Sequence, residues 1–328
     1  MTTSVQTPRA SERRRLDFFA MLRGYGLVWV LVALCGVATW LSPAFLNGMN
    51  LLNVLRQVSL LGIVGVGMTF VIITRGIDLS VGSMVGLIAV CTALTLTKGV
   101  PVSAVLAGAI GLGIALGVIN GLGISMGRLP AFIMTLGTMV MFRGMALSLA
   151  NGEPINVGDV QGFDFIGTGY IAQVPVPVYI FAITALIAYF VLRYTAFGRQ
   201  VYAVGSNAEA AHLAGINVKL VTFAVYVISG LAASVTSIIY VSRLTVGEPT
   251  AGTGLELEAI AVAVIGGTSL FGGEGGVVGT LIGAGIIAVL ANVLNLLGIS
   301  PFTQQIIKGA IIIAAVLFEA YRRKVQRA

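Results

Sequence analysis

The chain has 328 residues, of which 57% are hydrophobic and only 9% are charged. A soluble domain carries about 25% charged residues, so lipid must cover much of this chain. The net charge of +7 sits in short segments between apolar runs, where a membrane-orientation signal explains it without nucleic acid. The composition therefore predicts a single membrane bundle and excludes a soluble nucleic-acid-binding domain.

A basic tail, residues 1–23, precedes the first apolar stretch. The stretch is longer than a signal-peptide core and further spans follow, so it is interpreted as an uncleaved first helix with the tail in the cytoplasm. Cys35 and Cys91 both fall in apolar segments, and no disulfide framework is expected.

Apolar runs between charges or turn signals predict ten spans. They are 24–42, 57–74, 79–97, 101–126, 129–150, 174–192, 219–241, 255–271, 276–296 and 301–319. Helices satisfy their own backbone in lipid, so the predicted fold is an all-α polytopic bundle. The transmembrane permease domain is expected over 24–319, followed by a basic cytoplasmic tail, 320–328.

The distribution of Lys and Arg predicts the orientation. With the N-terminus inside, most of the 19 basic residues lie inside, and only Arg56, Lys98 and Arg243 lie outside, while Arg143 and Lys308 fall within spans. The longest outside loop, 151–173, has no Lys or Arg. Positive residues favour the cytoplasmic side, so both termini are expected there.

Two stretches five spans apart resemble one another. Residues 76–84 open the third span and residues 252–260 open the eighth, and each is followed about 45 residues later by Gly-Ile-Ser, at Gly123 and at Gly298. An odd separation places the copies in opposite orientations, which predicts an inverted repeat of the kind that transporters use for alternating access. Glycines at four-residue spacing, such as 113, 117 and 121, predict close helix packing.

The loop 193–219 contains a short candidate helix, 205–215, that is expected to be exposed in the cytoplasm. Ser206 and Glu209 have the spacing of a capping box, and Gly215 is expected to cap the other end. A helix this short does not persist alone, so it is expected to dock onto a partner. The alternative is an ordinary connecting loop.

Signals for catalysis are weak. A phosphate-binding loop needs Gly-Lys before Ser or Thr, and no lysine follows a glycine here, so any ATPase must be another polypeptide. Gly123–Gly127 matches the G-x-S-x-G nucleophile motif, but it lies at a span end, and the one histidine, His212, lies in the loop. No cluster has metal-ligand spacing.

Polar residues in or beside spans are candidates for the solute pathway, because intramembrane charges are costly. The candidates are Asp78, Ser80, Glu256, Glu258, Asn292, Asn295 and Lys308. The carboxylates at 78, 256 and 258 begin spans and have an equally good interpretation as helix caps. The two asparagines suit either sugar hydroxyls or helix-helix contacts. Arg143 is placed near the outer surface, where snorkelling accounts for it.

At this point the motifs resemble the ribose-type ABC permeases, which import monosaccharides. The resemblance rests on Arg75-Gly-Ile-Asp-Leu-Ser-Val-Gly-Ser83, on Glu248-Pro-Thr-Ala-Gly-Thr-Gly-Leu-Glu-Leu-Glu-Ala-Ile-Ala261 and on Ile265-Gly-Gly-Thr-Ser-Leu-Phe-Gly-Gly273, with further fits at 215–218 and 292–298. It runs from about residue 42 to the C-terminus.

The resemblance implies an ATPase with two nucleotide-binding halves, a periplasmic sugar-binding protein and a second permease copy in a homodimer or heterodimer, all at the bacterial inner membrane. It also implies that the coupling helix includes Ser206, Asn207, Glu209, Ala210, Ala211 and Gly215. ATP and Mg are expected on the partner, with no cofactor in this chain. The rival interpretations are an ion-coupled secondary transporter, an intramembrane enzyme and a branched-chain amino-acid permease.

Overall fold

The structure, a computed structural model, describes residues 26–327, and most of them are helical. The predicted basic tail, residues 1–23, lies outside this range. The helices are α2 (Gly26–Leu41), the 3₁₀-helix η1 (Pro43–Leu46), α3 (Gly48–Ile73), α4 (Val81–Thr97), α5 (Val102–Ser125), α6 (Ala131–Leu149), α7 (Asp164–Thr168), α8 (Val176–Tyr194), α9 (Ala196–Ser206), α10 (Ala208–Leu213), α11 (Val218–Leu244), α12 (Leu255–Ile265), α13 (Val277–Leu296) and α14 (Pro301–Arg327).

The helices form a membrane bundle, as predicted. Six of them in the described residues are long and apolar enough to cross a bilayer, namely α3, α5, α6, α8, α11 and α13, and α2 and α4 are shorter apolar helices. In its most apolar window α3 is 78% buried, whereas α5, α6 and α8 are 22–28% buried. The bundle is therefore built around α3, and α5, α6 and α8 turn most of their apolar side chains outward, as lipid-facing helices do.

Every predicted span overlaps a helix, although α3 begins at Gly48 rather than at residue 57, and two other boundaries differ in kind. The predicted span 255–271 contains α12, which has only 11 residues and is about 16 Å long, half of a bilayer core. It ends because Gly267 takes a left-handed φ of +88°. The last predicted span, 301–319, continues without a break as α14 to Arg327, so the predicted C-terminal tail is helical to that residue.

Helices of the first predicted repeat pack against helices of the second. The long helix α11 packs against α5 and α4, and α3 packs against α13 and α12. A Cβ atom at Gly117 of α5 would lie 2.5 Å from the carbonyl oxygen of Tyr226 on α11. A Cβ at Gly279 of α13 would likewise overlap the backbone of α12 at Gly266. These contacts confirm the prediction that the spaced glycines serve close helix packing.

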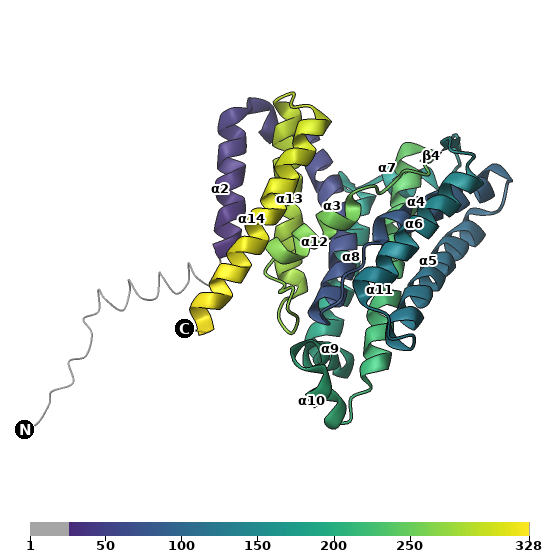
Figure 1. Ribbon diagram of the computed structural model, residues 1–328. Coiled ribbons are helices and arrows are strands. Elements are labelled where there is room, and N and C mark those ends of the chain that lie inside the picture. Colours follow the sequence, from purple (N-terminus) through teal and green to yellow (C-terminus); the bar gives the residue numbers. More distant parts are fainter. Residues whose placement is uncertain (1–25, 328) are drawn as a thin grey trace, which may run out of the picture.

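Two short antiparallel pairs join the connections at one end of the bundle. Strand β1 (Ile155–Asn156) pairs with β4 (Val246–Gly247), and β2 (Tyr170–Ile171) pairs with β3 (Val174–Pro175) across a two-residue turn. Figure 1 shows α7 and β4 at the upper end of the molecule, and α9, α10 and the C-terminal end of α14 at the lower end.

Candidate functional site

The loop 193–219 folds into two helices, α9 and α10, joined at Asn207. The Asn207 side chain accepts hydrogen bonds from the backbone amides of Glu209 and Ala210, both at 3.0 Å, and so caps α10. The predicted capping box of Ser206 and Glu209 is therefore wrong by one residue. Ser206 is the last residue of α9 and is still helical. The backbone of Asn207 beside it is extended, as the N-cap position requires.

The other end of α10 closes as the sequence predicts. Gly215 has a φ of +83°, its amide donates to the His212 carbonyl at 2.9 Å, and the Ile216 amide donates to the Ala211 carbonyl at 3.0 Å. This pair of bonds is a Schellman motif, in which a left-handed residue ends a helix. Capped at both ends, α10 has a fixed shape although it is six residues long.

The outer face of α10 is open. Ala211 is buried against the bundle, whereas the side chain of Leu213 is 82% exposed. A groove of about 730 Å³ runs beside the helix and is lined by Ala208, Glu209, His212 and residues 215–219. An exposed leucine beside a groove, on a helix rigidly held at both ends, is suited to docking another protein.

Asp78 and Ser80 lie in a fully buried polar network. Asp78 accepts hydrogen bonds from the Ser80 hydroxyl at 2.6 Å and, from α11, the Ser229 hydroxyl at 2.7 Å. Asn120 of α5 donates to Ser80 Oγ at 2.7 Å and accepts from Thr138 of α6 at 2.7 Å. Asp78 and Ser80 have no exposed surface. The network therefore ties together the start of α4 and three other helices, and neither residue faces a cavity.

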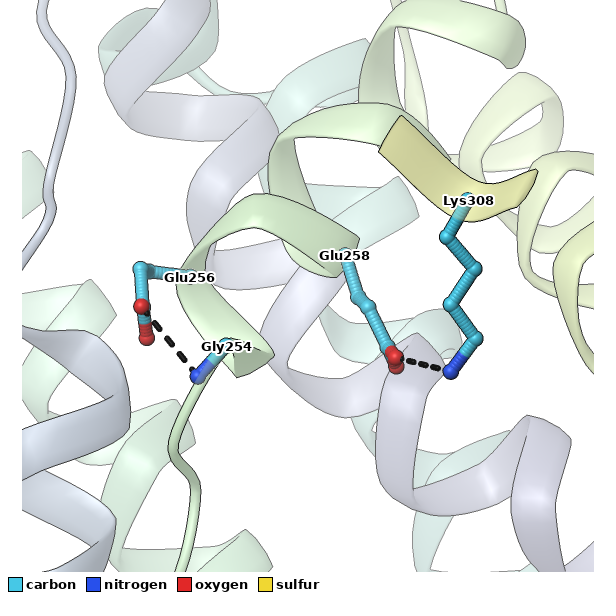
Figure 2. Close-up of polar contacts among 4 residues, drawn as sticks. All are labelled: Gly254, Glu256, Glu258 and Lys308. Atoms are coloured by element: carbon cyan, nitrogen blue, oxygen red, sulfur yellow. Dashed lines mark hydrogen bonds and ion pairs between the residues drawn. The ribbon is translucent and has the colours of Figure 1, made fainter. Parts of the chain in front are cut away.

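Glu256 and Glu258 leave α12 on opposite sides (Figure 2). Glu256 accepts a hydrogen bond from the Gly254 amide at 3.2 Å, which agrees with the capping interpretation. Glu258 forms an ion pair with Lys308 of α14, so two of the predicted pathway residues meet. Both charged side chains are mostly shielded, with exposed fractions of 28% and 22%.

Arg143 does not snorkel, contrary to expectation. Its guanidinium is partly buried and donates hydrogen bonds to the carbonyl oxygens of Pro249 and, at 2.9 Å, Ala251. These carbonyls belong to the segment between β4 and α12. Arg143 therefore holds this segment, and with it the start of α12, against α6.

Asn292 and Asn295 line a polar cavity of about 540 Å³. Its walls are Asn50, Asn53, Gln57, Arg243, Asn292, Asn295 and Leu296, contributed by α3, α11 and α13. The amides of Asn50 and Asn292 bond to each other in both directions, at 3.0 and 2.8 Å. The side chains of Gln57 and Asn295 form no hydrogen bond to another described residue. Apart from Arg243, the polar groups of the cavity are neutral amides, which both donate and accept hydrogen bonds and so can bind hydroxyl-rich solutes.

Sequence reasoning missed several residues of these sites. Asn50 falls between the first two predicted spans, 24–42 and 57–74, whereas in the structure α3 begins at Gly48 and includes it. Leu213 looked like one more apolar residue, although an isolated leucine on a short polar-flanked helix is a usable signal. Arg75 begins the motif 75–83 that carries the family resemblance, but its contacts cannot be inferred from its own sequence neighbourhood. Among the described residues no group of three His, Cys, Asp or Glu side chains could hold a metal ion.

Residues 50–316 match the family model described as the permease component of branched-chain amino acid transport systems. The chain belongs to this permease family. The permease is 44% identical over 316 residues to the ribose import permease of Escherichia coli K12, covering 95% of this chain and 98% of that one. It is likewise 44% identical over 311 residues to the ribose import permease of Bacillus subtilis 168, covering 94% and 96% of the two chains.

The D-allose transport system permease of E. coli K12 is 37% identical to this permease over 324 residues, which cover 97% and 98% of the two chains. No solved structure matches the chain. The family membership that the motifs predict is therefore confirmed. Like the permease components of its family, the permease is not an enzyme in its own right.

Proposed function

We propose that this permease forms the membrane pathway of an ATP-driven importer and moves a monosaccharide across the bacterial inner membrane. The observation that carries the proposal is the end-to-end similarity to permeases named for ribose, with 95% of this chain aligned. A relative named for allose aligns over nearly the whole chain as well. A branched-chain amino acid is disfavoured because these relatives carry sugar names.

The proposed partners follow from the resemblance to ribose-type ABC permeases and from the motif that the chain lacks. No lysine follows a glycine anywhere in it, so the ATPase, with two nucleotide-binding halves, is a separate polypeptide that binds ATP and Mg. A periplasmic binding protein delivers the sugar, and a second permease copy, identical or related, completes the pathway within the lipid membrane. Nucleic acid has no role.

The proposed coupling helix is α10. Its capped ends, the exposed Leu213 and the groove beside it support docking onto the ATPase. In this arrangement Asn207 and Gly215 fix the helix, Ala211 seats it on the bundle, and Ser206, Glu209 and Ala210 lie on or beside the docking face. Movement of the ATPase would then displace α10 as one unit.

The proposed topology has ten membrane segments, an inverted repeat and both termini in the cytoplasm. It is supported by segments that meet far from one another in sequence. Arg75, Gly205 and Gly273, all predicted inside, come together. The β1–β4 pair joins two connections that are both predicted outside. Opposite orientations of the halves suit alternating access.

The proposed sugar entrance is the polar cavity lined by Asn50, Gln57, Arg243, Asn292 and Asn295, because these residues are predicted near the outer surface. Glu256, Glu258 and Lys308, on and beside α12, are proposed to change partners when the pathway opens. Asp78 and Ser80 are proposed to hold the inner end of α4 in place against α5, α6 and α11. The permease shifts between states and forms no covalent bond with the sugar.

The decisive experiment is purification of the tagged complex, followed by uptake in proteoliposomes that contain the ATPase and the binding protein. Wild-type permease is expected to copurify an ATPase with two phosphate-binding loops and to import sugar only with ATP. Glu209→Lys and Gly215→Val are expected to lose coupling while the permease still inserts. Glu153→Lys, at an exposed glutamate of the opposite loop, is the control and should still copurify the ATPase.

Uptake that survives ATP depletion and disappears with a protonophore would overturn the proposal in favour of an ion-coupled transporter. Normal uptake by both the Glu209 and the Gly215 variants would remove α10 from the coupling role.

A further inference from the structure

The last turn of α9, directly before α10, is held by a side chain from a distant part of the chain. The Arg75 guanidinium donates from Nε to the Gly205 carbonyl at 2.6 Å and from Nη2 to the Ser206 carbonyl. Carbonyls at the end of a helix lack helical partners and carry partial negative charge. A planar guanidinium can bind two of them at once, which a lysine ammonium cannot do with the same geometry.

A third segment closes the same junction. The Gly273 amide donates to the Ile73 carbonyl at 2.9 Å, and the Tyr202 hydroxyl of α9 donates to the Gly275 carbonyl at 2.9 Å. Burial raises the pKa of the Tyr202 hydroxyl, so it remains neutral and able to donate. The end of α3, the end of α9 and the connection between α12 and α13 are thus bonded to one another.

The backbones at this junction are in direct contact. A Cβ atom at Gly205 would overlap the Ile73 carbonyl and lie 2.6 Å from the Gly273 amide. Arg75 itself has a φ of +65°, in the left-handed region that non-glycine residues rarely adopt. A strained residue persists only where its surroundings hold it, and such residues gather at functional sites.

The junction connects α10, the proposed coupling helix, with helices that line the polar cavity. Asn207, the cap of α10, follows Ser206 directly. Arg75 follows α3, which carries Asn50, and the Gly273 connection leads into α13, which carries Asn292. We propose that Arg75 is the positioning residue that passes displacement of α10 to α3 and α13, and so couples the ATPase to the sugar pathway. This inference rests on the proposed function.

The test uses the full complex with its ATPase and binding protein in proteoliposomes, and compares sugar imported per ATP hydrolysed. Arg75→Ala is expected to copurify the ATPase as the wild type does, since the α10 surface is unchanged. Sugar imported per ATP should fall about tenfold, the scale expected when hydrogen bonds to a charged group are lost. Arg75→Lys keeps the positive charge but cannot bind two carbonyls in the same planar geometry. Its sugar import per ATP should lie between the values of the wild type and Arg75→Ala.

Arg128→Ala is the matched control. Arg128 is also an exposed arginine after a membrane helix, with a left-handed φ of +56°, and it makes no hydrogen bond or ion pair to another described residue. It should import as the wild type does. The amount of folded complex and its melting temperature are measured for each variant, so that Arg75→Lys decides the matter if Arg75→Ala does not fold.

Wild-type import per ATP in both Arg75 variants would overturn this inference and leave the proposed function standing. Loss of both ATPase copurification and sugar import would also overturn it, because Arg75 would then shape the surface on which the ATPase docks. If the wild-type complex imports nothing with ATP, the proposed function falls and this inference falls with it.

Discussion

Asp78 combines complete burial with three hydrogen bonds, from the amide and hydroxyl of Ser80 and from the hydroxyl of Ser229. A carboxylate in such a place costs free energy unless these donors remain, and each donor needs the carboxylate in turn. The sequence offered two roles for this residue, a helix cap and a sugar contact. Its surroundings favour a structural role.

We therefore predict that Asp78→Ala lowers the stability of the permease by about 1–3 kcal/mol, because buried hydroxyls lose their acceptor. Asp78→Asn should lower the melting temperature less, and sugar uptake per folded molecule should remain near that of the wild type. The measurements are thermal unfolding in detergent and uptake in proteoliposomes. Asp159→Asn, at an exposed carboxylate of the loop 151–173, should change neither. A sugar contact would show the reverse pattern, with uptake lost at an unchanged melting temperature.

At the scale of single residues, caps and local turns were the most predictable features. Gly215 was found from the sequence because a left-handed helix end needs a residue without a Cβ. Ser206 was mistaken for the cap because Ser and Asn are equally good caps and stand side by side here. The partners of Arg75 lie 130 residues away, and no local pattern could reveal them.

Among the elements, α5 and α11 make the closest approach through glycines. The α5 face that carries Gly117 touches the α11 backbone, whereas Gly111 of the same helix has open space around it. We predict that Gly117→Val separates the two helices and costs about 1–3 kcal/mol of stability, as overpacking does. The yield of monodisperse protein and its melting temperature measure the effect. Gly111→Val is the matched control, and equal behaviour of the two variants would contradict the packing.

The ion pair between α12 and α14 makes a second prediction. Glu258→Lys and Lys308→Glu should each lower uptake and stability, since each places like charges together within the bundle. The double exchange should recover a coupling free energy of about 1 kcal/mol, a size usual for residues in contact. Thermal unfolding of the four proteins gives this coupling directly. Additive effects would mean that the pair does not hold the two helices together.

The elements themselves were largely predictable, because apolar length alone places a helix within each of the ten spans. Their ends were not. Residues 255–271 are continuous in hydropathy, but Gly266 packs on Gly279 and Gly267 turns left-handed, so α12 stops after 11 residues. Such an ending depends on what approaches the backbone, and that is decided by packing between the repeats.

For the whole molecule, the positive-inside pattern and the observed junctions agree on which ends share a side. The prediction places Lys98 and Asp159 on one side of the membrane and Arg128 and His212 on the other. We predict that, in a background with Cys35 and Cys91 replaced by serine, Lys98→Cys and Asp159→Cys react with a membrane-impermeant maleimide in intact cells. Arg128→Cys and His212→Cys should react only after the membrane is opened.

The same labelling decides whether α12 belongs to a crossing segment. Thr253 precedes α12 and Glu274 lies in the connection that follows it, and both residues are exposed. Glu274 adjoins Gly273, which is bonded to the end of α3, so Glu274→Cys should react only after opening, while Thr253→Cys reacts in intact cells. That result would make α12 and its extended flanks one complete crossing, with ten in all. If both cysteines react from one side, the α12 segment enters and leaves the membrane on that side. The number of complete crossings is then odd, which contradicts the predicted topology.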